Sequence, residues 1–188
     1  YGLPEETWKS LIDTYGIKAI YTNHDYEPYA RSRDEEMNAL CEDKNITFHT
    51  FKDQVIFEKE EILTKGGTPY SVFTPYSRSW RAALTKGHLA DRNTESHADA
   101  FWKAAPESMP SLSDMGFEKS NIPFPPRIPD KEIIKVYDEK RDYPAQKGTT
   151  RVGLHLRFGT LSIRKLARVA QRLNDTYLNE LIWREFYM

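Results

Sequence analysis

The first fifty residues alternate between two hydrophobic patterns, and this alternation restricts the fold more than any other feature. Apolar residues recur at helical spacing from Pro4 to Tyr15, and Gly16 suits the end of a helix. A strand is predicted over residues 17–21, a helix over 28–43 and a second strand over 46–51. Helices and strands that alternate in this way are typical of an α/β layer built on a parallel sheet.

The rest of the sequence predicts a change to an all-α fold. Six of the eleven prolines lie between Pro106 and Pro129, where no apolar pattern persists, which is typical of a long surface connection. Helical spacing resumes near Lys131 and continues to the last residue. We therefore expect an α/β domain over residues 1–85, a linker over 86–130 and the beginning of a helical domain over 131–188.

Charge and cysteine content exclude several classes of protein. The net charge of −1 argues against a protein that binds polyanions through its bulk charge. The one cysteine, Cys41, allows no disulfide within the chain and no cysteine-based metal site, which fits a reducing compartment such as the cytoplasm. No apolar run is long enough for a membrane span, so no membrane partner is expected. The chain starts at a tyrosine and stops inside a helical pattern, so we expect it to be cut from a longer protein.

A basic, hydroxyl-rich stretch is the first candidate for a binding site. Residues 147–172 contain seven Lys or Arg residues and no Asp or Glu. Within it, Gly148-Thr149-Thr150-Arg151 offers hydroxyls, backbone N–H groups and a guanidinium, which suit a phosphate group. A plain helix cap explains the two threonines equally well. Arg164, Arg168 and Arg172 recur every four residues, as expected either for contacts to nucleic-acid phosphates or for a solvated helix face.

The last predicted helix carries a second candidate. Glu180, Trp183, Arg184 and Tyr187 follow one another at i, i+3, i+4 and i+7, so they share one helix face. An indole can stack on a flat aromatic ligand, and a carboxylate can accept a hydrogen bond from a base edge. The competing interpretation is an ion pair between Glu180 and Arg184 beside a buried indole.

Four separate motifs resemble those of the photolyase/cryptochrome family. They are Tyr137-Asp138-Glu139-Lys140-Arg141-Asp142-Tyr143-Pro144, Gly148-Thr149-Thr150-Arg151, Leu156-Arg157-Phe158-Gly159-Thr160-Leu161-Ser162 and Asn179-Glu180-Leu181-Ile182-Trp183-Arg184-Glu185-Phe186-Tyr187. The last motif is similar to that of the bacterial class I cyclobutane pyrimidine dimer photolyases. Residues 23–34 and 72–76 also resemble the amino-terminal α/β domain of the family, so the resemblance spans nearly the whole chain.

The resemblance implies a fold and an activity. The expected fold is a Rossmann-like antenna domain with a parallel sheet, a long linker and a helical domain that holds FAD. The implied activity is light-driven repair of cyclobutane pyrimidine dimers in UV-damaged DNA, by electron transfer from reduced FAD to a flipped-out dimer. The residues present cover only part of such a protein, so we expect this chain to be inactive by itself and the full-length protein to be a monomer.

The resemblance also implies roles for individual residues. FAD would contact a set of residues in the helical part, with the loop at its phosphates: Tyr137, Thr149, Thr150, Arg151, Val152, Gly153, Tyr177 and Arg184. Gly153 stands where the family usually has serine, and Tyr177 stands where it often has tryptophan. Glu180 and Trp183 would act on the dimer as the catalytic pair, Glu180 at its base edge and Trp183 stacked on it. DNA would also contact Arg141 and Tyr187.

Two questions stay open at this point. Tyr29-Ala30 stands where the members that bind a folate antenna have an Asn-Glu pair, which argues against folate and leaves a deazaflavin, a flavin or no antenna.

A cryptochrome, which is a blue-light photoreceptor on the same scaffold, is the alternative to a repair lyase. The Glu180 and Trp183 pair favours repair, because signalling members need no face that reads a dimer. A third alternative is a basic nucleic-acid binder without a cofactor.

Overall fold

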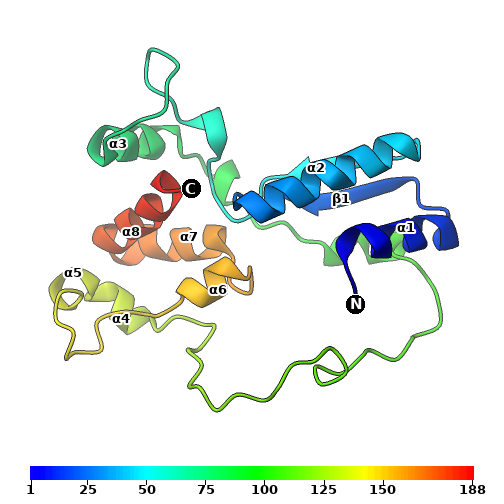
Figure 1. Cartoon of the computed structure of the whole chain (residues 1–188). Coiled ribbons are helices and arrows are strands. Elements are labelled where there is room, and N and C mark those ends of the chain that lie inside the picture. Colours follow the sequence, from blue (N-terminus) through cyan, green and yellow to red (C-terminus); the bar gives the residue numbers. More distant parts are fainter.

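The computed structural model describes all residues from 1 to 188. It has an α/β part and a helical part, and a long connection leaves the helical part and returns to it (Figure 1). The first part contains helix α1 (Pro4–Tyr15), strand β1 (Ala19–Asn23), helix α2 (Pro28–Asp43) and strand β2 (Thr47–Phe51). Gly16 ends α1 in the left-handed conformation at φ 59°, where glycine carries no steric cost. The two strands pair in parallel, with Ala19 opposite Thr47, so the predicted α/β order is confirmed.

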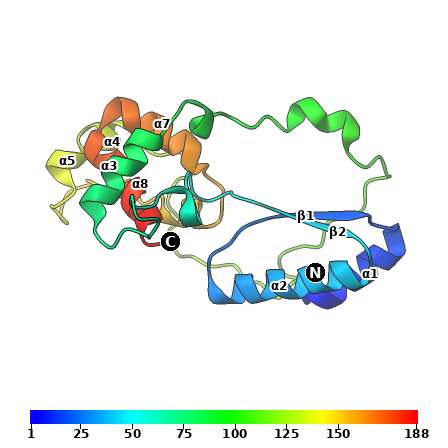
Figure 2. The same ribbon diagram turned by 90° about the horizontal axis from the view of Figure 1, so that it is seen from above.

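Both helices of the first part lie on the same side of the two-stranded sheet (Figure 2). Their small core contains Ile12, Ile20, Met37, Leu40 and Cys41. Because side chains alternate across a strand, Tyr21 points to the opposite face, where its ring stacks on His49 with centroids 4.6 Å apart.

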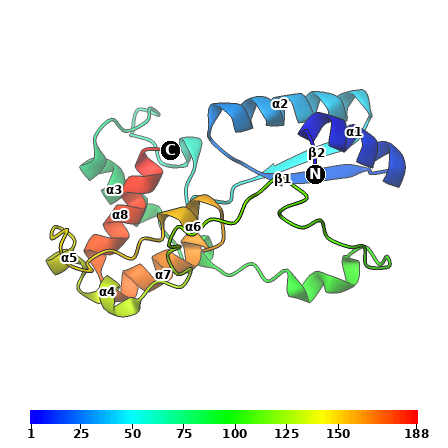
Figure 3. The same cartoon turned by 60° about the horizontal axis from the view of Figure 1, so that its bottom comes forward.

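The second part is helical and begins before the predicted linker. It contains 3₁₀ helix η1 (Lys59–Glu61) and helices α3 (Phe73–Ala83), α4 (Lys131–Lys135), α5 (Tyr137–Lys140), α6 (Gly153–Arg157), α7 (Ile163–Leu173) and α8 (Asp175–Phe186). Helix α8 packs between α3 and α7 (Figure 3). The main core of the molecule therefore combines Ile56, Phe57 and Trp80 from before the linker with residues of α4, α6, α7 and α8.

A single asparagine fixes the turn between the last two helices. Asn174 ends α7, and its side chain accepts a hydrogen bond from the backbone N–H of Tyr177 at 3.0 Å, which caps α8. Its amide group also donates to the carbonyl of Lys135 at 3.1 Å and to the carboxylate of Asp138 at 2.6 Å. These bonds hold α4 and α5 against the start of α8.

The connection over residues 86–130 runs along the outside of the molecule and contains two short 3₁₀ helices, η2 (Gly87–Leu89) and η3 (Glu95–Ala100). Its far end is fastened to α6 by a buried histidine. Nε2 of His155 donates to the carbonyl of Pro125 at 2.8 Å, and Nδ1 accepts from the hydroxyl of Thr160 at 2.8 Å. No helix of the chain combines the length and the apolar character that a membrane span requires.

Candidate functional site

The loop between α5 and α6 has the backbone of a binding loop. A Cβ at Gly148 would lie 2.3 Å from the carbonyl oxygen of Lys140, so no other residue fits there without a shift of the backbone. Arg151 adopts the left-handed conformation at φ 55°, which costs a non-glycine residue roughly 1–3 kcal/mol. None of the backbone N–H groups from Thr149 to Val152 donates to a backbone carbonyl. The loop thus presents consecutive donors that a ligand can use.

A cavity of about 510 Å³ opens beside this loop, lined by Lys147, Thr149, Thr150 and Arg151 together with linker residues including Phe124 and Asp130. The carboxylate of Asp130 caps α4, and the two cations and two hydroxyls suit an anionic group such as a phosphate. Val152 is buried in the main core, so its side chain is not available to a ligand.

An aromatic pair adjoins this cavity. The hydroxyl of Thr150 lies 2.7 Å from the phenol oxygen of Tyr177, and the ring of Tyr177 meets the ring of Tyr137 edge-on, with centroids 4.9 Å apart. Burial raises the pKa of both phenols, so both are neutral near pH 7. The structure thus brings Tyr137, Tyr177 and the Thr149–Gly153 loop together.

The polar side chains Glu180 and Arg184 of α8 pair with residues from other parts of the chain and not with each other. Glu180 forms its ion pair with Arg141, which follows α5, so the predicted pair of Glu180 with Arg184 is wrong. The two side chains are 38% and 35% exposed, so the pair faces solvent. Arg184 donates instead to the carbonyl of Gln54 at 2.6 Å, and burial lowers its pKa.

The Trp183 indole lies in a stack of rings and is only half-buried, contrary to the alternative of a buried indole. Phe73 is stacked on it with centroids 3.6 Å apart and an angle of 6° between the planes. Tyr187 is nearly parallel to it at 5.4 Å and 18°. Glu180 lies three residues before Trp183 in the same helix, so the two share one face of α8, as the spacing predicted.

Two arginines of α7 donate hydrogen bonds to chain segments that are distant in the sequence. Arg164 donates to the carbonyl of Asp53 at 2.7 Å and to that of Val55 at 3.3 Å, and Arg168 donates to the carbonyl of Leu89 and to Asp91. Neither side chain is simply solvated, and neither is free for a phosphate. The predictions of phosphate contacts and of a solvated helix face are therefore both wrong for Arg164 and Arg168. Helical spacing describes α7 alone and does not include the chain segments that pack on it.

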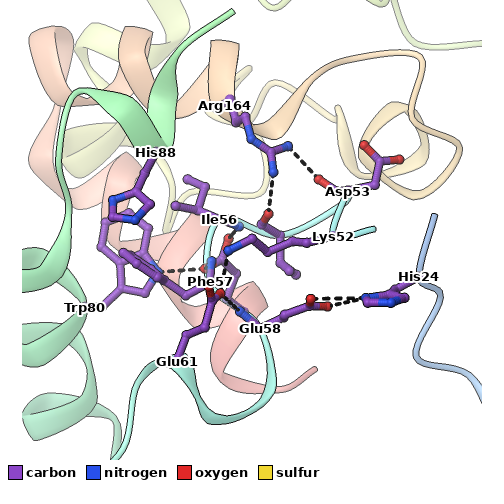
Figure 4. Close-up of polar contacts among 12 residues, drawn as sticks. His24, Lys52, Asp53, Ile56, Phe57, Glu58, Glu61, Trp80, His88 and Arg164 are labelled. Carbon is purple, nitrogen blue, oxygen red and sulfur yellow. Dashed lines mark hydrogen bonds and ion pairs between the residues drawn. The ribbon is translucent and has the colours of Figure 1, made fainter. Parts of the chain in front are cut away.

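Glu185 is absent from the predicted site residues, and the structure buries it at the contact between α8 and the segment over residues 53–57 (the 53–57 segment). Its carboxylate accepts from the indole N–H of Trp80 at 2.7 Å, from the backbone N–H of Phe57 at 3.2 Å and from that of Ile56. The three donor residues are labelled in Figure 4. Burial raises the pKa of Glu185, and the three hydrogen bonds oppose that rise. The available signal was an acid on the apolar face of α8, four residues after Leu181.

Another polar group lies at the carboxyl ends of the two strands, beside a cavity of about 1230 Å³. Glu58 accepts from the phenol of Tyr26 at 2.5 Å and lies 2.9 Å from Nδ1 of His24. Burial alone would raise the pKa of Glu58, but these hydrogen bonds outweigh it and lower the pKa. Tyr29 is exposed and Ala30 is buried.

The fold and these surfaces define a class of protein: an α/β layer tied to a helical part that presents a phosphate-suited loop beside an aromatic helix face. A family model described as DNA photolyase matches residues 1–97. The chain belongs to the DNA photolyase family, as the motifs predicted.

Curated relatives agree with this assignment. The chain is 28% identical over 214 residues to a deoxyribodipyrimidine photo-lyase of Synechococcus, which covers 99% of this chain and 44% of the relative. It is 27% identical to the enzyme of that name from Escherichia coli, with 97% of this chain and 42% of the relative covered. It is also 30% identical to an uncharacterized 31.6 kDa protein of another Synechococcus strain, with 98% of this chain and 72% of that protein covered. The chain thus spans less than half of the photo-lyases that it matches.

Solved structures confirm the fold. A bacterial class III photolyase from Agrobacterium tumefaciens superposes with a TM-score of 0.74 at 23% identity and covers 98% of this chain and 43% of that chain. An archaeal photolyase from Sulfolobus tokodaii, described as having two FAD molecules, superposes with a TM-score of 0.58 at 22% identity. Over this chain, the photolyase arrangement of an α/β layer followed by helices is therefore present.

Proposed function

We propose that the chain is part of a light-driven deoxyribodipyrimidine photo-lyase that repairs cyclobutane pyrimidine dimers in DNA. The observation that supports this most is that Glu180 and Trp183 lie three residues apart on one face of α8, with Arg141 paired to Glu180. The names of the curated relatives point to the same activity. Because the chain spans less than half of those relatives, the activity is proposed for a longer protein that contains it, here termed the full-length protein.

In this proposal the loop from Thr149 to Gly153 holds the phosphates of FAD. The free N–H groups, the hydroxyls of Thr149 and Thr150 and the guanidinium of Arg151 are the donors that a diphosphate requires. Tyr137 and Tyr177 supply the aromatic wall next to the loop. When bound and reduced, the flavin supplies the electron that light transfers to the dimer.

The α8 face would receive the dimer after it leaves the base stack. Trp183 stacks on the flipped base, and Glu180 accepts a hydrogen bond at its edge. For this, the ion pair between Glu180 and Arg141 opens, which costs only about 0–1 kcal/mol because the pair is partly exposed. The released Arg141 then binds a DNA phosphate, with Tyr187 beside it. We also propose that Arg184, which donates to the carbonyl of Gln54, contacts the flavin.

The test is repair of a thymine-dimer oligonucleotide by the full-length protein under blue light, together with its visible absorption spectrum before and after illumination. We expect flavin absorbance, repair that depends on light, and weaker dimer binding in Trp183→Ala. Trp102→Ala is the matched control, because Trp102 lies in the linker and is 79% exposed. A flavoprotein that does not repair would support the cryptochrome alternative, and a protein without flavin would contradict both.

We also propose that these 188 residues alone neither bind FAD tightly nor repair dimers, since they supply only part of the expected pocket. Stoichiometric FAD binding and dimer repair by the purified chain would contradict this. The antenna is proposed to be a chromophore other than folate or none, on the basis of Tyr29 and Ala30. A monomeric protein in the cytoplasm remains a prediction that gel filtration and fractionation can check.

A further inference from the structure

The ring stack at Trp183 joins two parts of the chain that lie on opposite sides of the linker. Phe73 is the first residue of α3, whereas Trp183 lies in α8. Their rings are parallel within 6° and 3.6 Å apart at their centroids, the closest aromatic pair in the chain. Phe73 is also held edge-on by Phe186 at 5.8 Å, so its own ring is fixed from a second side.

The opposite face of the indole is covered only by the exposed ring of Tyr187. Tyr187 is nearly parallel to Trp183, but it makes no ring contact with Phe73, so the two rings lie on opposite faces of the indole. Tyr187 is 77% exposed, whereas Phe73 is packed against the main core. A base that stacks on Trp183 therefore takes the face that Phe73 does not cover, and it displaces the exposed ring of Tyr187 from that face.

We propose that Phe73 is a positioning residue for recognition of the dimer: by covering one face of Trp183 it fixes the plane of the indole on which the flipped base stacks. This inference rests on the proposed function, because it assumes that Trp183 stacks on the dimer. Phe73 touches no substrate itself. Without its ring, the indole can rotate about χ1 and χ2, and the base has to order it on binding.

The test is a comparison of the full-length protein with Phe73→Leu, Phe73→Tyr and Phe57→Leu. Phe57→Leu is the matched control: Phe57 belongs to the same core and packs edge-on against Trp80, but it has no ring contact with Trp183. The measurement is the dissociation constant for DNA with and without a thymine dimer, together with the melting temperature of each variant.

We expect Phe73→Leu to weaken binding of dimer DNA by about three- to tenfold, the range of an aromatic pair, and to change binding of undamaged DNA by less than about twofold. Phe73→Tyr should restore the preference for the dimer, and Phe57→Leu should keep it. If Phe73→Leu does not fold, Phe73→Met removes the ring at similar volume and should show the same loss.

Two results would overturn the inference alone. One is an unchanged dimer preference in Phe73→Leu while Trp183→Ala loses it, which leaves the proposed function intact. The other is an equal loss in Phe73→Leu and Phe57→Leu, which would indicate a general effect on stability. A wild-type protein without any preference for dimer DNA would instead refute the proposed function, and the inference with it.

Discussion

Replacement of Glu185 by glutamine tests whether the buried carboxylate stabilises the contact between α8 and the 53–57 segment. One carboxylate oxygen accepts from Ile56, and the other accepts from Phe57 and Trp80. A glutamine has a single acceptor oxygen at that position and an NH₂ group at the other. If its oxygen serves Phe57 and Trp80, the NH₂ group faces the N–H of Ile56, and this donor is left unsatisfied.

The expected magnitude follows from these contacts. An unsatisfied buried donor costs about 1–3 kcal/mol. Burial raises the pKa of Glu185, which means that the buried carboxylate is costly to keep charged. Glutamine removes this cost and so offsets part of the loss of stability. We therefore expect Glu185→Gln to lower the free energy of unfolding by about 1–2 kcal/mol. Glu185→Ala leaves all three donors without a partner and should cost more, about 3–5 kcal/mol, since each unsatisfied buried donor costs about 1–3 kcal/mol.

The assay is guanidinium unfolding of the full-length protein at pH 7, followed by circular dichroism and by tryptophan fluorescence. Glu180→Gln is the control on the same helix, because its ion pair is partly exposed and its loss should cost less than about 1 kcal/mol. Equal or higher stability of Glu185→Gln would refute the reasoning, since it would mean that the cost of burying the carboxylate exceeds the worth of its hydrogen bonds.

Three further substitutions test other features. Gly148→Ala should lower the free energy of unfolding by about 1–3 kcal/mol, measured by the same unfolding assay, because its Cβ would meet a carbonyl oxygen at 2.3 Å. Burial alone would raise the pKa of Asp25, but bonds from an arginine and two backbone N–H groups lower it, so its stabilisation is present above about pH 4 and is lost as the pH falls through the lowered pKa. Asp25→Asn should therefore flatten the acid side of the stability profile, and Asp53→Asn, whose carboxylate makes no hydrogen bond, should not. Gly153→Ser should fit, because a Cβ there meets no atom within 4 Å, and under the proposed function it should raise FAD affinity in a fluorescence titration.

Local patterns predicted the elements because they depend on residues close in sequence. The bounds of α2 agree with the prediction, since Pro28 and the apolar spacing act within one helix. Strand β1 begins two residues later than expected, because pairing with β2 decides where the ladder starts. The face shared by Glu180 and Trp183 also followed from helical spacing alone.

Long-range partners could not be predicted in this way. Arg164 lies on the polar side of its helix, and nothing near it in the sequence indicates that its guanidinium binds carbonyls 109 and 111 residues away. The pairing of Glu180 with Arg141 has the same cause, because a partner four residues away was visible and one 39 residues away was not. Phe73 and Trp183 meet only because α3 packs on α8.

The hydrogen bonds of Glu185 also bear on the order in which the chain folds during its synthesis on the ribosome. Ile56 and Glu185 are 129 residues apart, so at typical rates of synthesis the donor waits on the order of 10 s for its acceptor. The small core around Ile12 and Cys41 can close as soon as β2 has emerged, whereas Phe57 and Trp80 remain open to water or to chaperones until α8 arrives. We therefore expect the nascent chain to fold in two stages, with apolar residues of the main core exposed in the interval between them.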